Sequence, residues 1–281
     1  MAISINTNVA SMNAQRNLGR TQGALAGNLG RLSTGLRINT ASDDAAGLAI
    51  SEKLKSQVRS LGQAERNAND AVSMLQTAEG AMNEVSGILT RMRELSVQSA
   101  NGTLGSDERG FLNDEVTALR DELDRIANVT EFNGNSLLTG GTTGTTFNFQ
   151  VGIGATSSDS ISATIKGVAS ADLGGVTGGL GSVDISTSTG ARDALAVIDQ
   201  AINDVSSRRA DMGSVQNRLN VTISNLGSAR ENLSAANSRI RDVDVASETA
   251  DMTRNNILMQ AGVSVLAQAN QAPSVALALL G

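Results

Sequence analysis

The side chains that carry most enzymatic chemistry are missing from this chain. Its 281 residues contain no Cys and no His. A thiol nucleophile, a disulfide, a zinc site built on Cys or His, and every catalytic triad that uses His are therefore excluded. The remaining candidates for chemistry are acidic pairs and glycine-rich turns.

Two acidic pairs have spacings that could carry chemistry. Asp43 and Asp44 could act as a carboxylate pair in acid–base catalysis, but adjacent residues in the first turn of a helix point apart. Asp242 and Asp244 begin like an EF-hand calcium loop, but Ser247 occupies the position that requires Gly. We interpret the first pair as helix capping and the second as solvated acids on a helix.

Two glycine-rich segments could cradle a phosphate group. Gly152 and Gly154 lack the third glycine and the following helix of a dinucleotide-binding turn. The glycines in 174–181 are not followed by the Lys-Ser/Thr pair of a P-loop. The net charge is −6, so there is no basic excess for nucleic acid. We expect no catalytic, cofactor-binding or metal-binding residues, no cofactor and no nucleic-acid partner.

Long helices dominate the elements that the sequence predicts. Residues 1–128 and about 189–281 have helical patterns, and the only proline is Pro273. Apolar residues recur about every 3.5 residues from Leu54 to Leu95, which is typical of a long helix that packs against other helices. We expect the helical content to be far above the roughly one-third that is usual for globular proteins.

Capping residues indicate where the helices begin and end. Ser42 precedes two aspartates, and Ser106 precedes Asp107 and Glu108. Acidic residues in a first turn complement the helix dipole. The sequence therefore predicts a long helix that starts after Ser42 and ends near residue 100, and a shorter helix over about 107–128.

The middle of the chain follows a different pattern. Apolar and polar residues alternate from Thr145 to Ile153 and again from Ile161 to Ile165, which predicts a β-hairpin over about 145–166. Residues of about 167–190 are rich in Gly, Ser and Thr and predict an exposed loop. The expected fold class is mainly α: a long antiparallel, coiled-coil-like bundle formed by the N- and C-terminal parts, with a small β-hairpin in the middle.

The two ends of the chain are amphipathic but carry unusual charge distributions. Residues 1–42 contain no Asp or Glu, and residues 255–281 contain no charged side chain. The C-terminal helix could dock on its own domain, or it could become ordered only against other chains. We favour the second interpretation, because an uncharged amphipathic helix is unusual on the surface of a monomer.

Conventional targeting signals are absent from the sequence. The N-terminus has no basic start followed by an apolar stretch, as a cleavable secretory signal requires. No window holds about 18 uninterrupted apolar residues, so we expect no membrane insertion. By these signals alone the chain is a soluble cytoplasmic protein, although an export route without cleavage would escape this test.

Several segments at both ends of the chain resemble bacterial flagellin. The resemblance covers about residues 1–153 and 190–281, and the short middle resembles a minimal flagellin without outer domains. The segments that carry it are RLSTGLRIN (31–39), DDAAG (43–47), RNAND (66–70), EFNG (131–134), GSVQNR (213–218) and QAGVSVLAQAN (260–270).

This resemblance implies a structural subunit, not an enzyme, that polymerises into the extracellular flagellar filament used for swimming motility. It implies unprocessed secretion by the flagellar type III export route. The implied partners are further copies of the chain, the flagellar cap, hook-junction proteins and an export chaperone that holds the C-terminal segment. Residues 1–42 and 239–281 would form an inner domain of terminal helices, and 43–238 an outer helical domain.

Two sets of residues are expected to carry these interactions. An apolar stripe on the terminal helices is expected to pack subunits together. The resemblance further implies a patch for a vertebrate innate immune receptor, although the same residues could serve packing between subunits. The stripe consists of Leu25, Leu29, Leu32, Leu36, Leu258, Val265 and Leu266, and the patch of Arg91, Leu95 and Glu115.

Of three other candidate functions, only the first remains as an alternative. A hook–filament junction protein shares the terminal helices but forms only a short ring. A flagellin with a metallopeptidase insert would need His, which this chain lacks. A membrane-active amphipathic helix would present Lys or Arg and bulky aromatic residues, and residues 255–281 offer neither.

Overall fold

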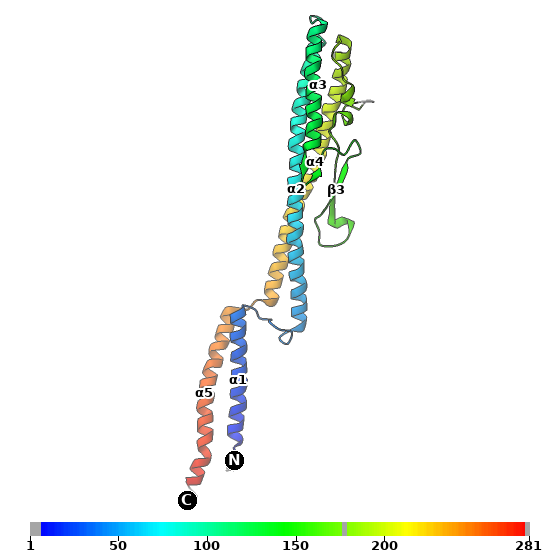
Figure 1. Cartoon of the computed structure of the whole chain (residues 1–281). Helices are drawn as coiled ribbons and strands as arrows, with labels where there is room; N and C mark the ends of the chain where they lie inside the picture. The colour runs from blue at the N-terminus through cyan, green and yellow to red at the C-terminus, as the bar shows by residue number, and fades with distance from the viewer. Residues whose placement is uncertain (1–6, 176–178, 279–281) are drawn as a thin grey trace. The chain divides into compact units, whose positions relative to one another are not determined.

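Helices form most of the computed structural model, which describes residues 7–175 and 179–278, and of 272–278 only the backbone (Figure 1). A small antiparallel strand region lies in the middle of the chain, so the predicted mainly α fold class is confirmed. The helices are α1 (Val9–Thr34), α2 (Ala45–Ser99), α3 (Ser106–Val129), α4 (Ser188–Arg241) and α5 (Val245–Ala278). The strands are β1 (Glu131–Phe132), β2 (Asn135–Ser136), β3 (Thr145–Gln150) and β4 (Ser160–Ile165).

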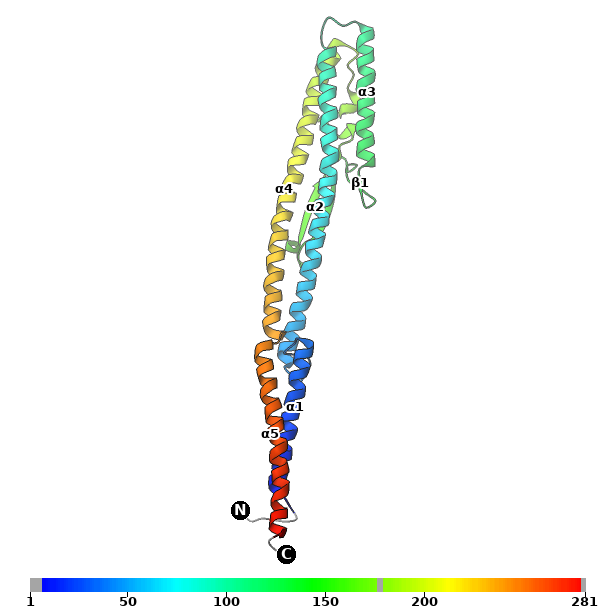
Figure 2. The same ribbon diagram turned by 90° about the vertical axis from the view of Figure 1, so that its left-hand side faces the viewer.

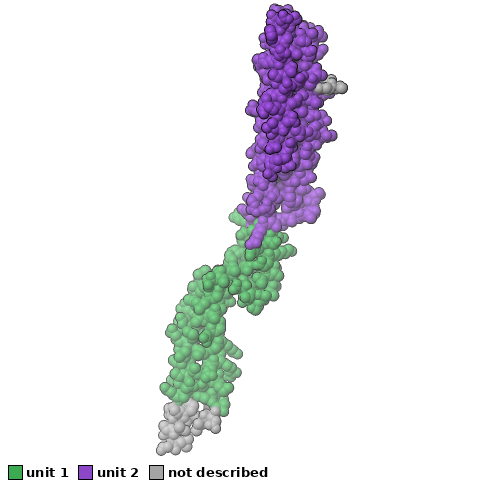
Figure 3. Space-filling model, in the orientation of Figure 1, with its two compact units in different colours: residues 1–58, 231–281 green, residues 59–230 purple. Residues whose placement is uncertain are grey.

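The chain divides into two compact units (Figure 3). Residues 1–58 and 231–281 form one, which we call the terminal unit, and residues 59–230 form the other, the central unit. Both dividing points fall inside long helices, α2 and α4. The expected inner domain of 1–42 and 239–281 concerns the assembled state and stays a prediction.

The central unit is built on α2, α3 and the part of α4 before residue 231, which lie side by side (Figure 2). The apolar residues that recur along α2 face inward, and the fully buried Leu75, Met82 and Leu89 follow one another at intervals of seven. A seven-residue repeat keeps one face of a helix against its partners. The predicted helical packing of this segment is therefore confirmed.

The start of α2 differs from the prediction by two residues. The helix begins at Ala45, and the Asp44 Oδ1 atom accepts a hydrogen bond from the backbone N–H of Gly47 at 2.9 Å. Asp43 instead accepts from the backbone N–H of Thr40 at 2.9 Å and closes the preceding turn. The second aspartate, not Ser42, therefore caps the helix.

The start of α3 is close to the sequence prediction. Asp107 and Glu108 occupy the first turn of α3, as predicted. The helix ends at Val129, within a residue or two of the predicted end near 128.

The predicted β-hairpin is confirmed. Strands β3 and β4 pair antiparallel, with Phe147 opposite Ala163 and Phe149 opposite Ile161. Ile161 and Ala163 are buried against the helices. The alternation of apolar and polar residues therefore corresponds to one buried face of the hairpin. The Asn133–Gly134 turn between β1 and β2 has positive φ angles at both residues, as a tight two-residue hairpin turn requires.

The expectation of an exposed loop over 167–190 is wrong for most of the described part of this segment. Short 3₁₀ turns lie at Ser170–Asp172 and Gly179–Ser182, and α4 already begins at Ser188. Four apolar side chains of the segment are buried in the core of the central unit. They are Val168, Leu173, Leu180 and Ile185. The prediction failed because these apolar residues are few and widely spaced in a segment that is otherwise rich in Gly, Ser and Thr.

Candidate assembly surface

The terminal unit pairs the two ends of the chain. Near the N-terminus of α1, the Asn8 Nδ2 atom donates to the carbonyl oxygen of Ala269 at 2.7 Å. Near the other end of α1, Arg31 Nε lies 2.9 Å from Glu248 Oε1. These two contacts show that α1 and α5 run antiparallel (Figure 1).

The segments that follow α1 and α4 are also joined. Gly35 ends α1 in the left-handed region, with φ of 72°, where glycine has no Cβ penalty. The backbone N–H of Arg37 then donates to Arg241 O at 2.6 Å, and that of Val243 donates to Gly35 O at 3.0 Å. Main-chain hydrogen bonds therefore join the segment that follows α1 to the segment that connects α4 to α5.

The helix pair has no fully buried apolar side chain among its described residues. In the described side chains of the terminal unit (7–58 and 231–271), Ile38 is the only buried apolar residue, and it lies in the segment after α1. Two helices share a single contact line, so residues on either side of that line stay open. The apolar side chains of α1 and α5 are thus left exposed or half-buried.

The predicted stripe divides into two groups. Leu29, Leu258 and Val265 are 52%, 50% and 54% exposed. Leu25, Leu32 and Leu266 are half-buried. Leu36 lies beyond the end of α1, where it forms an isolated bridge with Asp242.

Further exposed apolar residues lie on the same two helices outside the predicted stripe. They are Val9, Met12, Ile257 and Val263. The apolar pattern of the sequence includes the first three, and it missed Val263. A shallow apolar hollow of about 260 Å³ also lies along the pair, with Leu18, Leu258 and Val265 in its lining.

Only part of the predicted receptor patch is exposed at the surface. Arg91 donates from Nη2 to Glu115 Oε1 at 2.8 Å and from Nη1 to Glu94 Oε2 at 3.1 Å. Hydrogen bonds to these two carboxylates raise the pKa of Arg91 above its usual value. Leu95 is fully buried in the helical core. The structure therefore brings Arg91 and Glu115 together at the surface and corrects the expectation that Leu95 is exposed.

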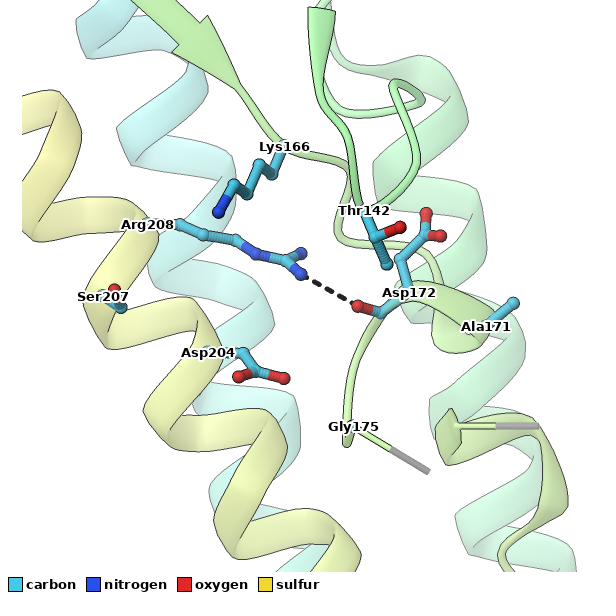
Figure 4. Close-up of a pocket in the computed structure, with 8 residues that line it drawn as sticks. All are labelled: Thr142, Lys166, Ala171, Asp172, Gly175, Asp204, Ser207 and Arg208. Atoms are coloured by element: carbon cyan, nitrogen blue, oxygen red, sulfur yellow. Dashed lines mark hydrogen bonds between the residues drawn. The ribbon is translucent and has the colours of Figure 1, made fainter. Parts of the chain in front are cut away.

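A polar cavity of about 390 Å³ beside α4 contains Arg208, which sequence reasoning also missed (Figure 4). Arg208 is almost fully buried and donates to the carbonyl oxygens of Gly167 and Asp172. Burial lowers the pKa of Arg208, and the nearby Asp204 and Asp172 act in the opposite direction. Because its guanidinium is bound to the main chain, we interpret this residue as a clamp on the 167–175 segment.

Nothing in the described residues indicates a metal centre or a membrane span. No group of three or more Cys, His, Asp or Glu side chains is placed to hold a metal ion in residues 7–175 and 179–278. No helix within the same limits is long and apolar enough to cross a bilayer.

The long helices and the exposed terminal pair define a helical structural protein with a large interaction surface. The N-terminal helical region of bacterial flagellin matches residues 5–143, and the C-terminal helical region matches residues 195–280. The chain therefore belongs to the bacterial flagellin family. Flagellins are structural proteins of the extracellular flagellar filament, not enzymes, and the chain is a filament subunit of minimal form.

Similar proteins extend over nearly the whole chain. A flagellin of Halalkalibacterium halodurans is 48% identical over 278 residues, which is 98% of this chain and 99% of that protein. A flagellin of Bacillus subtilis is 45% identical over 303 residues, with the same coverage. A putative flagellar hook-associated protein of Vibrio parahaemolyticus shares the fold, with a TM-score of 0.59, 17% identity, and coverage of 71% of this chain and all of that one.

Proposed function

We propose that the chain polymerises through its terminal helices, so that α1 and α5 of each subunit are covered by α1 and α5 of its neighbours. The observation that carries this proposal is the lack of a buried apolar core in the helix pair, where Ile38 is the only buried apolar side chain among the described residues of the unit. Exposed apolar patches of this extent on a soluble protein mark interaction sites.

A single substitution on the exposed side of α5 tests this proposal. Val265 is 54% exposed, so Val265→Asp costs the isolated subunit little and places an unpaired charge in the proposed interface. We expect no filaments from this variant after sulfate addition, and a circular dichroism spectrum that matches the wild type. Normal filaments would contradict the proposal.

The matched control is Val129→Asp. Val129 is 61% exposed on α3 in the central unit. This variant is expected to polymerise as the wild type does. If both variants failed equally, the loss would not be specific to the terminal helices.

Export and accessory partners follow from the flagellin resemblance. The subunit would leave the cell unprocessed by the flagellar type III route, with a chaperone that holds the C-terminal segment, and would be added under the cap beyond the hook-junction proteins. The exposed side chains of α5 support a need for protection before assembly. Mass spectrometry of shed filaments is expected to detect the unprocessed N-terminal peptide, with or without its first Met, and a cleaved leader would contradict this route.

Recognition of the monomer by a vertebrate innate immune receptor is a second candidate function. It is favoured by the exposed ion pair of Arg91 and Glu115. Arg91→Ala is expected to reduce the activation of receptor-bearing cells by monomers, while its neighbour variant Arg93→Ala retains it. A wild-type monomer that fails to activate such cells would remove this function.

The hook–filament junction role remains the alternative. A junction protein forms a short ring, so it would give short oligomers of fixed size under conditions that favour polymerisation. Filaments of unlimited length would exclude it. The match of both flagellin regions across most of the chain supports the filament protein.

A further inference from the structure

The two most exposed large apolar side chains of the described residues both belong to the central unit. Phe111 on α3 is 74% exposed, and Val221 on α4 is 71% exposed. The chain has only four Phe residues. A bulky aromatic side chain that stays in solvent is the type of residue that anchors protein interfaces.

Val221 lines a groove between α4 and the loop that joins β3 to β4. The groove has a volume of about 740 Å³, and Val151, Ile161 and Leu226 form its apolar part. Val151 and Ile161 belong to the hydrophobic core of the central unit, so the apolar part of the groove adjoins that core, and Leu226 is also buried. A groove of this size accepts an aromatic side chain.

Charges around the two features are complementary. On α3, Asp107 and Asp114 lie four and three residues from Phe111 and therefore share its side of the helix. Glu115 is also four residues away, but its charge is paired with Arg91. The groove is lined by Arg218 and contains no acidic side chain in its lining. Arg218 has no acidic partner within 4 Å in the described residues. The two carboxylates beside Phe111 thus complement a groove that carries an unpaired cation.

Phe111 cannot reach the groove of its own copy. Arg109 Nε donates to Ser99 O at the C-terminal end of α2, so Phe111 lies near that end. The groove lies near Asn67, whose Nδ2 donates to Gln150 O. About 30 residues of α2 separate Asn67 from Ser99, which is about 45 Å at 1.5 Å per residue.

We propose that Phe111 of one subunit inserts into the groove beside Val221 of a second subunit. The contact joins two different surfaces of the same unit, so it is heterologous and can repeat from copy to copy, as a helical filament requires. It rests on the proposed polymerisation and adds a second set of contacts, in the central unit, to those of the terminal helices.

Disulfide trapping tests this contact, because the natural chain has no Cys. The full-length chain carrying both Phe111→Cys and Val221→Cys is polymerised with sulfate and then oxidised. A disulfide requires Cβ atoms within about 3.5–4.5 Å. We expect a ladder of linked dimers, trimers and larger species on a non-reducing denaturing gel, and no ladder from unpolymerised subunits.

The matched control pairs Val129→Cys with Val221→Cys, because Val129 is a similarly exposed residue of α3. This control is expected to give no ladder. If the double variant with Phe111→Cys does not polymerise, the two single variants are each mixed as minor components into wild-type chain. A disulfide-linked dimer of one Phe111→Cys chain and one Val221→Cys chain then shows that the two positions meet between subunits.

Charge variants give an independent measurement. Arg218→Glu is expected to slow filament growth at least about tenfold, because like charges would oppose each other across the contact. Adding Asp114→Arg is expected to restore much of that loss. Filaments that form normally but give no cross-link and no charge effect would overturn the Phe111 contact and leave the proposed polymerisation standing. A wild-type chain that forms no filaments would instead remove the proposed function.

Discussion

Arg208 of α4 donates from Nη2 to the main-chain carbonyl of Asp172 at 2.8 Å, and a second nitrogen of the same guanidinium binds Gly167. A buried cation therefore fastens a segment that has no regular secondary structure over most of its length. Asp124 of α3 accepts from the backbone N–H of Ser170 at 2.7 Å, so the segment is held from two helices.

Removing this clamp is expected to destabilise the central unit. Arg208→Ala leaves the carbonyl groups of Gly167 and Asp172 without their donor, and each unsatisfied buried group costs about 1–3 kcal/mol. We expect the free energy of unfolding to fall by about 2–4 kcal/mol in urea denaturation. The neighbour Arg209 is 3.9 Å from Glu79 and more exposed. Arg209→Ala is therefore expected to change the free energy of unfolding by less than about 0.5 kcal/mol. Equal effects of both variants would contradict the clamp.

Deleting a core side chain of α2 is expected to cost more than deleting an exposed one. Leu89 is fully buried among the three helices, and Leu→Ala changes in a core cost about 2–5 kcal/mol. Val97 lies on the same helix and is exposed, so Val97→Ala serves as the control. Its free energy of unfolding is expected to lie within about 0.5 kcal/mol of the wild-type value. Urea denaturation of both variants checks this, and a Leu89→Ala cost below about 1 kcal/mol would argue against the described packing.

Acid is expected to loosen the loop between β3 and β4. Asp159 accepts hydrogen bonds from the backbone N–H and the Oγ1 hydroxyl of Thr156, and these bonds hold the pKa of Asp159 below its usual value. A lowered carboxyl pKa stabilises the folded loop above the unfolded pKa, and the contribution is lost as pH falls through the folded pKa. The protection of the Thr156 amide, measured as its exchange rate relative to the intrinsic rate at the same pH, should therefore persist down to about pH 4 and be lost below it.

The neutral variant Asp159→Asn is the control for this acid effect. It is expected to show lower protection of the Thr156 amide at neutral pH, with little further loss of protection on acidification. An acid response that is unchanged in this variant would assign the effect to another group.

A charge at Leu266 is expected to abolish polymerisation. Leu266 is half-buried on α5. Full burial of an exposed Leu contributes roughly 1.5–3 kcal/mol, so covering the rest of Leu266 contributes part of that, and a charge there would be desolvated. Leu266→Asp should give no filaments by electron microscopy, while the central unit keeps its urea midpoint. Normal filaments from this variant would show that α5 does not pack as proposed.

The long helices and the hairpin could be predicted because their apolar residues repeat with the period of the element. The track from Leu54 to Leu95 covers most of α2, and the predicted start after Ser42 and end near residue 100 lie within a few residues of the observed Ala45–Ser99. The same track already contained Leu95, so periodicity placed it in the core, and its burial conflicts with a role at the surface. Local pattern was the stronger guide to where this side chain lies.

The clamped segment could not be predicted from local pattern. Its position depends on side chains more than 30 residues away in the sequence, such as Arg208. The available signal was that Arg208 falls between the buried Val205 and Met212 on the inward face of α4. An arginine on an apolar face indicates a buried partner, but the sequence does not reveal which carbonyl groups accept its hydrogen bonds.

The most direct test of the account is electron microscopy of the purified full-length chain and of a truncated chain that lacks 1–42 and 239–281, both after sulfate addition. Sulfate strengthens the burial of apolar surface. The account predicts long filaments from the full-length chain and none from the truncated chain, whose central core is expected to remain folded by circular dichroism. Filaments from the truncated chain, or only short closed oligomers from the full-length chain, would contradict it.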